Sequence, residues 1–379
     1  MKEYIKICLI YIYRFIFSFF KVFPIKNNRI FFIAFMGKSF SCNPKAIYEK
    51  LISEQSNSFD CVWALKDTSK FPYKNNTKVV KYLSFSFFYY LLTSKFVITN
   101  YSISPKFPIR KKQILINTWH GGGAYKKVGL NDIVKERKRV NLVFDILSKE
   151  TSYFISSCRI FTDVMSETMR LDKNQFLNIG MPRNDVFFRD YSDISKKVRN
   201  QYNISTSYGI VLFAPTYRGL PNSASENITL NIKDLLLALQ EKYNKPFVCF
   251  YRGHYYVKGS ISEDCINTSD YPDMQDLLCA ADVLITDYSS SIWDFALTKK
   301  PCFLFTPDLD DYSSSVKFYT DIKDWGFPIC QTNEELLSTI KNFNYENYKE
   351  NLIKAKDFYG SYEEGTSSSQ VATLLKSFL

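Results

Sequence analysis

The stretch DVLITDYSSSIWDFALTKKPCFLFTPD, residues 282–308, contains the pattern that decides the fold. A short apolar strand over residues 283–286 is followed by Asp287 and three serines, then by a helix over residues 290–300 and a second apolar run. Apolar runs that alternate with amphipathic stretches indicate an α/β fold, in which helices cover both faces of a parallel sheet.

The same alternation occurs in two series along the chain. The first begins at residue 29 with RIFFIAFMG, and the second begins after residue 200 with YGIVLFAPT. Between them, residues 183–205 are richer in charge and weaker in periodicity, and 379 residues are more than one core usually holds. We therefore predict two Rossmann-like doubly wound domains, over residues 26–195 and 196–379, with a cleft between them.

The N-terminal segment, residues 1–25, has a membrane character. On a helix, Lys6, Arg14, Ser18 and Lys21 fall in one narrow stripe and leave a broad aromatic and aliphatic face. This pattern favours a helix that lies in the membrane interface. A spanning helix would bury Arg14 at a cost of about 2.5–3.5 kcal/mol. A helix docked against the protein core is the remaining alternative.

Composition and charge limit the class of protein. Hydrophobic residues make up 46% of the chain and charged residues 23%, which argues against disorder and against a membrane protein with many spans. The net charge of +11 is compatible with nucleic acid, an anionic membrane surface or a phosphorylated substrate. Nine scattered cysteines without a CxxC pair indicate a reduced, cytoplasmic protein. Two histidines without a neighbouring ligand set argue against a metal site.

Basic residues gather in the first half of the chain. The stretch IVKERKRV, residues 133–140, is accompanied by Arg110, Lys111, Lys112, Lys126 and Lys127. Each basic side chain close to an anionic leaflet contributes about 1 kcal/mol, so this group could hold the first domain against lipid phosphates. The alternative is an ordinary solvated face.

Unusual polar residues follow several predicted strands, and in open α/β sheets ligands bind at the carboxyl ends of strands. Both histidines are beside glycine and could transfer protons near neutral pH. The three serines before a helix predict an anion site, with Ser289 or Ser290 as the cap; plain capping of a buried helix is the alternative. Asp294, one turn further, could accept from ribose hydroxyls. The candidates after strands are His120, Gly121, Thr216, Arg218, Arg252, His254, Asp287, Ser289, Ser290 and Ser291.

Seven stretches, taken in order, resemble the CDP-glycerol glycerophosphotransferase family of teichoic-acid primases, teichoic-acid polymerases and their capsule-synthesis relatives. They lie between about residues 90 and 336 and read SKFVITN, NTWHGGGAYKKVG, NIGMPRNDVFF, FAPTYRG, YRGH, SDYPDMQDLLCAADVLITDYSSSIWDFALTKKPCFLFTPDLDDY and FPICQTNEEL.

The resemblance implies a GT-B-like fold and metal-independent transfer, without a cofactor, of a polyol phosphate from a CDP-polyol to a lipid-linked saccharide acceptor. It implies a peripheral protein at the cytoplasmic face of the membrane and no nucleic-acid partner. His120 matches the proposed base, and His254 with Arg252 matches the group that contacts the donor pyrophosphate. Arg218 and the serines at residues 289–291 would surround the same pyrophosphate, and Asp294 would hold the ribose.

Three positions depart from the family pattern. Gly122 and Gly123 replace the usual Thr-Pro, residues 316–319 read VKFY where Arg-Gly-Phe-Tyr is usual, and Tyr255 replaces a proline. These departures leave the polyol open between glycerol, 2-glycerol and ribitol, and they mark where the acceptor differs. A glycosyltransferase that uses a nucleotide sugar and a basic membrane-surface or nucleic-acid-binding protein are the competing hypotheses.

Overall fold

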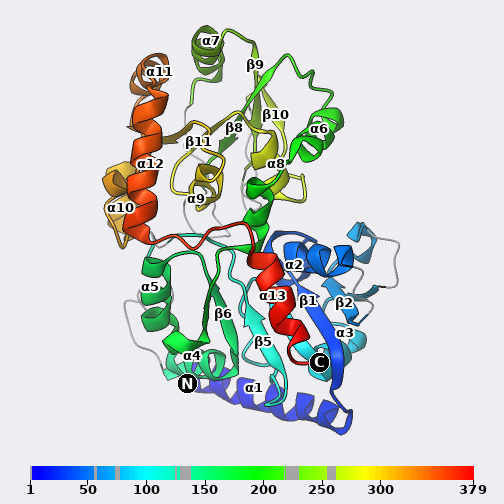
Figure 1. Ribbon diagram of the computed structural model, residues 1–379. Coiled ribbons are helices and arrows are strands. Elements are labelled where there is room, and N and C mark those ends of the chain that lie inside the picture. Colours follow the sequence, from blue (N-terminus) through cyan, green and yellow to red (C-terminus); the bar gives the residue numbers. More distant parts are fainter. Residues whose placement is uncertain are drawn as a thin grey trace. The chain divides into compact units, whose positions relative to one another are not determined.

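The computed structural model describes residues 2–54, 58–72, 77–123, 126–128, 138–216, 218, 230–253 and 262–379. The chain forms two compact units, each built around one parallel sheet (Figure 1). Unit 1 comprises Met1–Gly121, Val128–Asp185 and Ser361–Leu379; unit 2 comprises Gly122–Lys127 and Val186–Gly360. The prediction of two parallel-sheet α/β domains is therefore confirmed.

Unit 1 contains a seven-stranded sheet in the order β3-β2-β1-β4-β5-β6-β7. Every pairing between neighbouring strands is parallel, and Ile30 of β1, for example, lies between Cys61 and Phe96. The central strands are apolar on both faces, which the helices cover. The strands are β1 (Lys26–Ile33), β2 (Asp60–Leu65), β3 (Lys78–Lys81), β4 (Ser94–Thr99), β5 (Ile114–Asn117), β6 (Tyr153–Ser156) and β7 (Phe176–Asn178). The α-helices are α1 (Lys2–Phe17), α2 (Cys42–Ser53), α3 (Phe85–Thr93), α4 (Lys138–Glu150), α5 (Arg159–Met169) and α13 (Ser367–Lys376).

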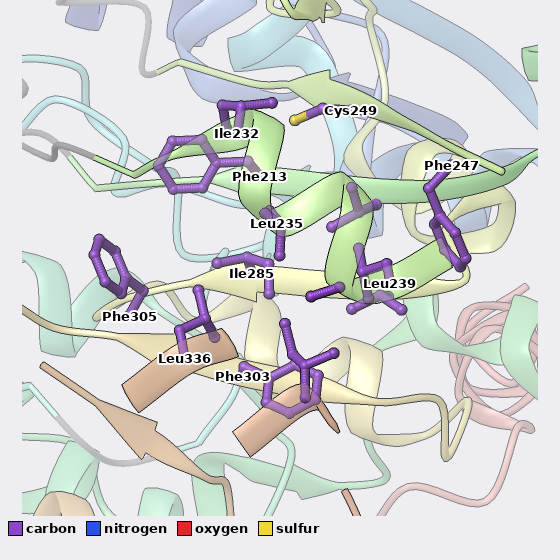
Figure 2. Close-up of a cluster of buried hydrophobic side chains, with 14 of the residues drawn as sticks. Phe213, Ile232, Leu235, Leu239, Phe247, Cys249, Ile285, Phe303, Phe305 and Leu336 are labelled. Atoms are coloured by element: carbon purple, nitrogen blue, oxygen red, sulfur yellow. The ribbon is translucent and has the colours of Figure 1, made fainter. Parts of the chain in front are cut away.

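Unit 2 contains a six-stranded sheet in the order β10-β9-β8-β11-β12-β13, also parallel throughout. Figure 2 shows its core, where Leu235 and Leu239 of α7 lie over Phe213 and Ile285 of the sheet. The strands are β8 (Gly209–Ala214), β9 (Phe247–Tyr251), β10 (Cys265–Asn267), β11 (Val283–Thr286), β12 (Cys302–Phe305) and β13 (Ile329–Cys330). The α-helices are α6 (Ser192–Gln201), α7 (Ile232–Tyr243), α8 (Met274–Ala280), α9 (Ser291–Ala296), α10 (Leu309–Ser315), α11 (Asn333–Lys341) and α12 (Tyr345–Tyr359).

The division of the chain differs from the predicted boundaries, residues 26–195 and 196–379. The chain returns to unit 1 at Ser361, because the Asp185 carboxylate accepts from the backbone N–H groups of Ser367 and Ser368 at 3.0 and 2.7 Å. These bonds cap the start of α13, which packs against α2. The loop Gly122–Lys127 likewise belongs to unit 2, although its neighbours on both sides in sequence belong to unit 1.

The N-terminal segment begins with a helix, as predicted, and α1 lies beside α4 (Figure 1). The predicted polar stripe is not wholly solvated: the Arg14 guanidinium pairs with Glu150 and donates to the Pro105 carbonyl at 2.9 Å. Phe17 stacks on Phe88 at 4.3 Å between ring centroids. The apolar side chains turned away from the unit include Phe15, which is 80% exposed. Among the described residues, no helix has the length and apolar character needed to cross a bilayer.

The predicted basic cluster is divided in the structure. Arg110 donates to the carbonyls of Phe23, Leu92 and Lys21, so it ties together segments of unit 1. Lys126 and Lys127 belong to unit 2 and not to the first domain. Residues 133–137 lie outside the described part of the chain. Seven of the nine cysteines are buried, which agrees with their reading as core residues.

Candidate active site

His120 is held at the carboxyl end of the unit 1 sheet. The chain leaves β5 through Trp119, which has a φ of +52°, a strained value for a bulky residue. His120 Nδ1 then lies 2.9 Å from the backbone oxygen of Asn100, which follows β4. A carbonyl oxygen can only accept, so Nδ1 carries the proton and Nε2 keeps its lone pair. The imidazole is therefore in the tautomer that can accept a proton through Nε2.

Aromatic rings surround the His120 imidazole. Tyr101 stacks on it at 5.3 Å, and Trp119 and Phe35 lie at 4.8 and 5.8 Å between ring centroids. Burial lowers the pKa of His120 to about 4; the nearby charge of Arg183 acts in the same direction, whereas the bond to Asn100 opposes it. The neutral form therefore predominates at pH 7, as a general base requires. Gly121, the next residue, is half-buried at the end of this segment of unit 1.

Arg218 is at the centre of a charged cluster in unit 2. It follows β8, and its side chain is only 13% exposed. Nε and Nη2 bind the two carboxylate oxygens of Asp308 at 2.5 and 3.0 Å, and Nη2 also lies 2.9 Å from Asp287. Nη1 donates to the carbonyl and hydroxyl oxygens of Thr216 at 2.6 and 2.9 Å. These contacts account for all five N–H groups of the guanidinium.

Asp287 joins the ends of β8 and β11. Its carboxylate, which is 1% exposed, accepts from the backbone N–H groups of Thr216 at 2.9 Å and of Tyr288 at 2.6 Å. Burial raises the pKa of Asp287, and the positive charge of Arg218 acts against that shift. The structure thus brings three sequence-predicted residues together, with Asp287 as the buried carboxylate that orients Thr216 and Arg218.

The serine-rich turn lies between β11 and α9. Ser289 Oγ accepts from the backbone N–H of Ser291, the first residue of α9, at 3.3 Å and from its hydroxyl at 2.9 Å. Ser290 has helical angles and its side chain makes no capping bond. The helix is shorter than predicted and ends after Ala296, before Lys299 takes a φ of +58°. Its first residue, Ser291, follows Asp287 by four positions in the sequence.

Asp294 faces the interior of unit 2. Its side chain is buried, and its carboxylate accepts from Gln275 of α8 at 2.8 Å. The sequence places Asp294 one turn after Ser290 but does not show that this face of α9 packs against α8. Its ribose-binding role stays a prediction.

Arg252 follows β9 and ties down the segment after β10. It donates to the carbonyls of Thr268 and Tyr271 at 3.3 and 2.8 Å, and the backbone N–H of Gly253 donates to Ser269 Oγ at 3.0 Å. These bonds order the SDYPDM stretch, which leads into α8. His254 lies outside the described residues.

Two features of unit 2 were not assigned a role from the sequence. Gly123, which has a φ of +68°, packs so closely on Trp293 that a Cβ there would lie 2.5 Å from the indole nitrogen. Tyr288 and Tyr312 stack at 3.8 Å, and Arg218 lies 5.2 and 4.8 Å from the two ring centres. The sequence contains the glycine run and the motif DLDDY, but it does not show which residues either of them contacts. Among the described residues there is no cluster of three or more potential metal ligands.

Comparisons with known proteins show the family to which the chain belongs. Residues 15–377 match the family model described as CDP-Glycerol:Poly(glycerophosphate) glycerophosphotransferase. The teichoic acid poly(glycerol phosphate) polymerase of Bacillus spizizenii is 28% identical, over 96% of this chain and 95% of that protein. The teichoic acid glycerol-phosphate transferase of Staphylococcus aureus is 27% identical, over 91% and 92%.

Relatives of greater length and a solved structure extend the comparison. The chain matches only 48% of the length of the Bacillus subtilis teichoic acid poly(glycerol phosphate) polymerase, to which it is 25% identical. A solved structure of the wall teichoic acid polymerase TagF, 26% identical, matches with a TM-score of 0.82 over 95% of this chain and 92% of that chain.

Proposed function

Because this chain belongs to the CDP-glycerol:poly(glycerophosphate) glycerophosphotransferase family, we propose that it transfers glycerol phosphate, or a related polyol phosphate, from CDP-glycerol to a membrane-linked saccharide. CMP is the second product, and the reaction uses no metal or other cofactor. The setting is the synthesis of teichoic acid or a similar capsular polymer. The observation that carries the proposal is a neutral His120 with its Nε2 lone pair available, within a chain that matches the family almost throughout.

The chemistry follows from the groups present. An acceptor hydroxyl oxygen attacks the β-phosphorus, which bears the polyol, and the new P–O bond forms there. The bond from that phosphorus to the bridging oxygen breaks, and the oxygen leaves on CMP with its electron pair. His120 Nε2 takes the proton of the hydroxyl. The pKa of about 4 makes His120 a weak base at equilibrium, so its contribution depends on removing the proton as the new bond forms.

The donor side lies in unit 2 at the ends of β8, β9 and β11. We assign the diphosphate to the turn at Ser289–Ser291 and to the segment that begins at Arg252 and continues into His254. Arg218 acts there by fixing Thr216 and the two carboxylates, because these groups already occupy its five N–H groups. The charge that grows on the leaving CMP is the main quantity such a site must stabilise.

The N-terminal segment attaches the enzyme to the cytoplasmic face of the membrane. The most exposed of its apolar side chains are Phe15, Phe19 and Val22, which are 80%, 64% and 68% exposed. Phe85, 70% exposed, extends this surface and lies 5.4 Å from Phe20 between ring centroids. Large apolar side chains with Lys6 and Lys21 nearby fit the interface of an anionic bilayer. This peripheral attachment brings the enzyme to its lipid-linked acceptor.

The direct test is CMP release by the purified protein. We expect release from CDP-glycerol in the presence of a lipid-linked saccharide, and its loss in His120→Ala with an unchanged thermal midpoint. A panel of CDP-glycerol, CDP-ribitol and CDP-2-glycerol identifies the polyol. Turnover of UDP- or GDP-sugars with no turnover of any CDP-polyol would instead support the glycosyltransferase hypothesis.

A further inference from the structure

The loop Gly122–Lys127 follows His120 in sequence but packs within unit 2. Gly123 lies against the Trp293 indole of α9. The backbone N–H of Lys127 donates to the carbonyl of Lys317 at 2.8 Å, and Lys126 forms an antiparallel bridge with Phe318. These three anchors fix the loop where two departures from the family pattern meet: the glycines and the VKFY stretch.

The anchored loop places the Lys126 side chain at the charged cluster. Its ammonium lies 5.3 Å from the Tyr312 ring centre, and Tyr312 also stacks with Tyr288. The residue is half-buried. Burial lowers the pKa of Lys126 to about 8; Asp287 acts against this shift and Arg218 reinforces it. The protein therefore holds an ammonium where water solvates it poorly, an arrangement that an anionic ligand would stabilise.

The described groups that act on Lys126 include two charged residues at strand ends and one ring. They are Arg218 after β8, Asp287 after β11 and Tyr312 of α10. The carboxyl ends of strands in an open parallel sheet are where ligands bind. Arg218, the obvious cation for an anionic ligand, already directs its N–H groups to Thr216, Asp287 and Asp308.

We propose that the Lys126 ammonium binds a phosphate oxygen of the CDP-polyol donor, as a donor-site residue supplied by the loop that follows the proposed base in sequence. The inference rests on the proposed function. A charge-assisted hydrogen bond to the diphosphate lowers the energy of the charge that builds up as CMP leaves. Lys126 follows His120 by six positions, so one short segment of the sequence supplies both side chains.

The test compares Lys126→Gln and Lys126→Arg with the matched control Lys127→Gln, a half-buried neighbour whose backbone makes the anchoring bond. Binding of CDP-glycerol, CMP and cytidine is measured by calorimetry at fixed ionic strength. Loss of one charge-assisted hydrogen bond should weaken CDP-glycerol binding by Lys126→Gln about 10- to 100-fold and leave cytidine binding unchanged. Lys127→Gln should stay within about twofold of the wild type.

Binding measured over a series of pH values adds a second test. A lysine with a purely structural role would not make the affinity for CDP-glycerol depend on its own charge. Lys126 loses its charge as pH rises through about 8, so wild-type affinity for CDP-glycerol should fall above that pH. Lys126→Arg should retain its affinity to higher pH, because arginine stays charged. If the Lys126→Gln variant is folded and binds CDP-glycerol with wild-type affinity, the inference about Lys126 is wrong and the proposed function is unaffected. A wild type that binds no CDP-polyol would overturn the proposed function and the inference with it.

Discussion

Gly123→Ala is the substitution for which the structure gives the clearest expectation. The backbone at Gly123 has a φ of +68°, in the left-handed region. An alanine there costs about 1–2 kcal/mol, because its Cβ approaches the following carbonyl oxygen. The second cost is steric: the new Cβ would lie 2.5, 2.7 and 2.7 Å from three atoms of the Trp293 indole.

Trp293 has little room to yield to the new methyl group. Its ring lies 4.6 Å from Tyr359, 5.8 Å from Phe327 and 6.2 Å from Trp325 between centroids. Overpacking at such a site usually costs about 1–3 kcal/mol. The sum with the backbone strain is about 2–5 kcal/mol, and lifting a six-residue loop is cheaper than unfolding unit 2. We therefore expect the loop to lose its contact with Trp293, and Lys126 to move away from the charged cluster with the loop.

The assay for Gly123→Ala is kcat/KM for CDP-glycerol together with thermal unfolding. After partial relaxation we expect kcat/KM to fall about 10- to 100-fold, with a midpoint close to that of the wild type. In Trp293→Ala the ring that the new Cβ would meet is absent, so adding Gly123→Ala to that variant should cost less than in the wild type. An unchanged kcat/KM in Gly123→Ala, or the same cost in both backgrounds, would refute the packing argument.

Three further predictions address the base, the charged cluster and the membrane surface. The pKa of His120, lowered to about 4, keeps the imidazole neutral down to that pH, so kcat/KM should show no His120 titration near 6.5; an NMR titration of the ring at 6.5 would contradict this. Arg218→Ala removes the guanidinium that pairs with the buried Asp287 carboxylate, so it should lower the free energy of unfolding in urea by about 3–5 kcal/mol. An unchanged urea midpoint would contradict this prediction. Phe15→Glu should reduce sedimentation with anionic vesicles without changing the thermal midpoint, whereas Ile353→Glu, exposed to 59% on α12, should sediment normally; equal sedimentation of both would exclude this surface.

Much of the fold was predictable because it depends on local patterns. Short apolar runs predicted the parallel strands, and the structure has His120, Arg218 and Asp287 after strands, as the sequence analysis expected. The domain boundaries were harder to predict from the sequence, because Asp185 binds Ser367, which is 182 positions away in sequence. No periodicity in either segment indicates that contact.

The conformation of the glycine run is a second feature that depends on tertiary contacts. The family usually has proline at the position of Gly123, and proline holds φ near about −65°. The observed φ of +68° is incompatible with that ring, so the loop here follows a path that proline would not allow. The sequence indicated a departure, but only the structure shows that Trp293 and Lys317 receive the loop. A family motif therefore located the segment without predicting its conformation.

The central claim is that this chain moves a polyol phosphate from a CDP-polyol, with His120 as the base. Its most direct test is the rate of CMP release from CDP-glycerol with a lipid-linked saccharide acceptor, measured for the wild type and for His120→Gln. We predict release by the wild type and a loss of about 100-fold or more in a variant that keeps its fold and its affinity for CDP-glycerol. Wild-type rates in His120→Gln would contradict the account, as would release from nucleotide sugars alone.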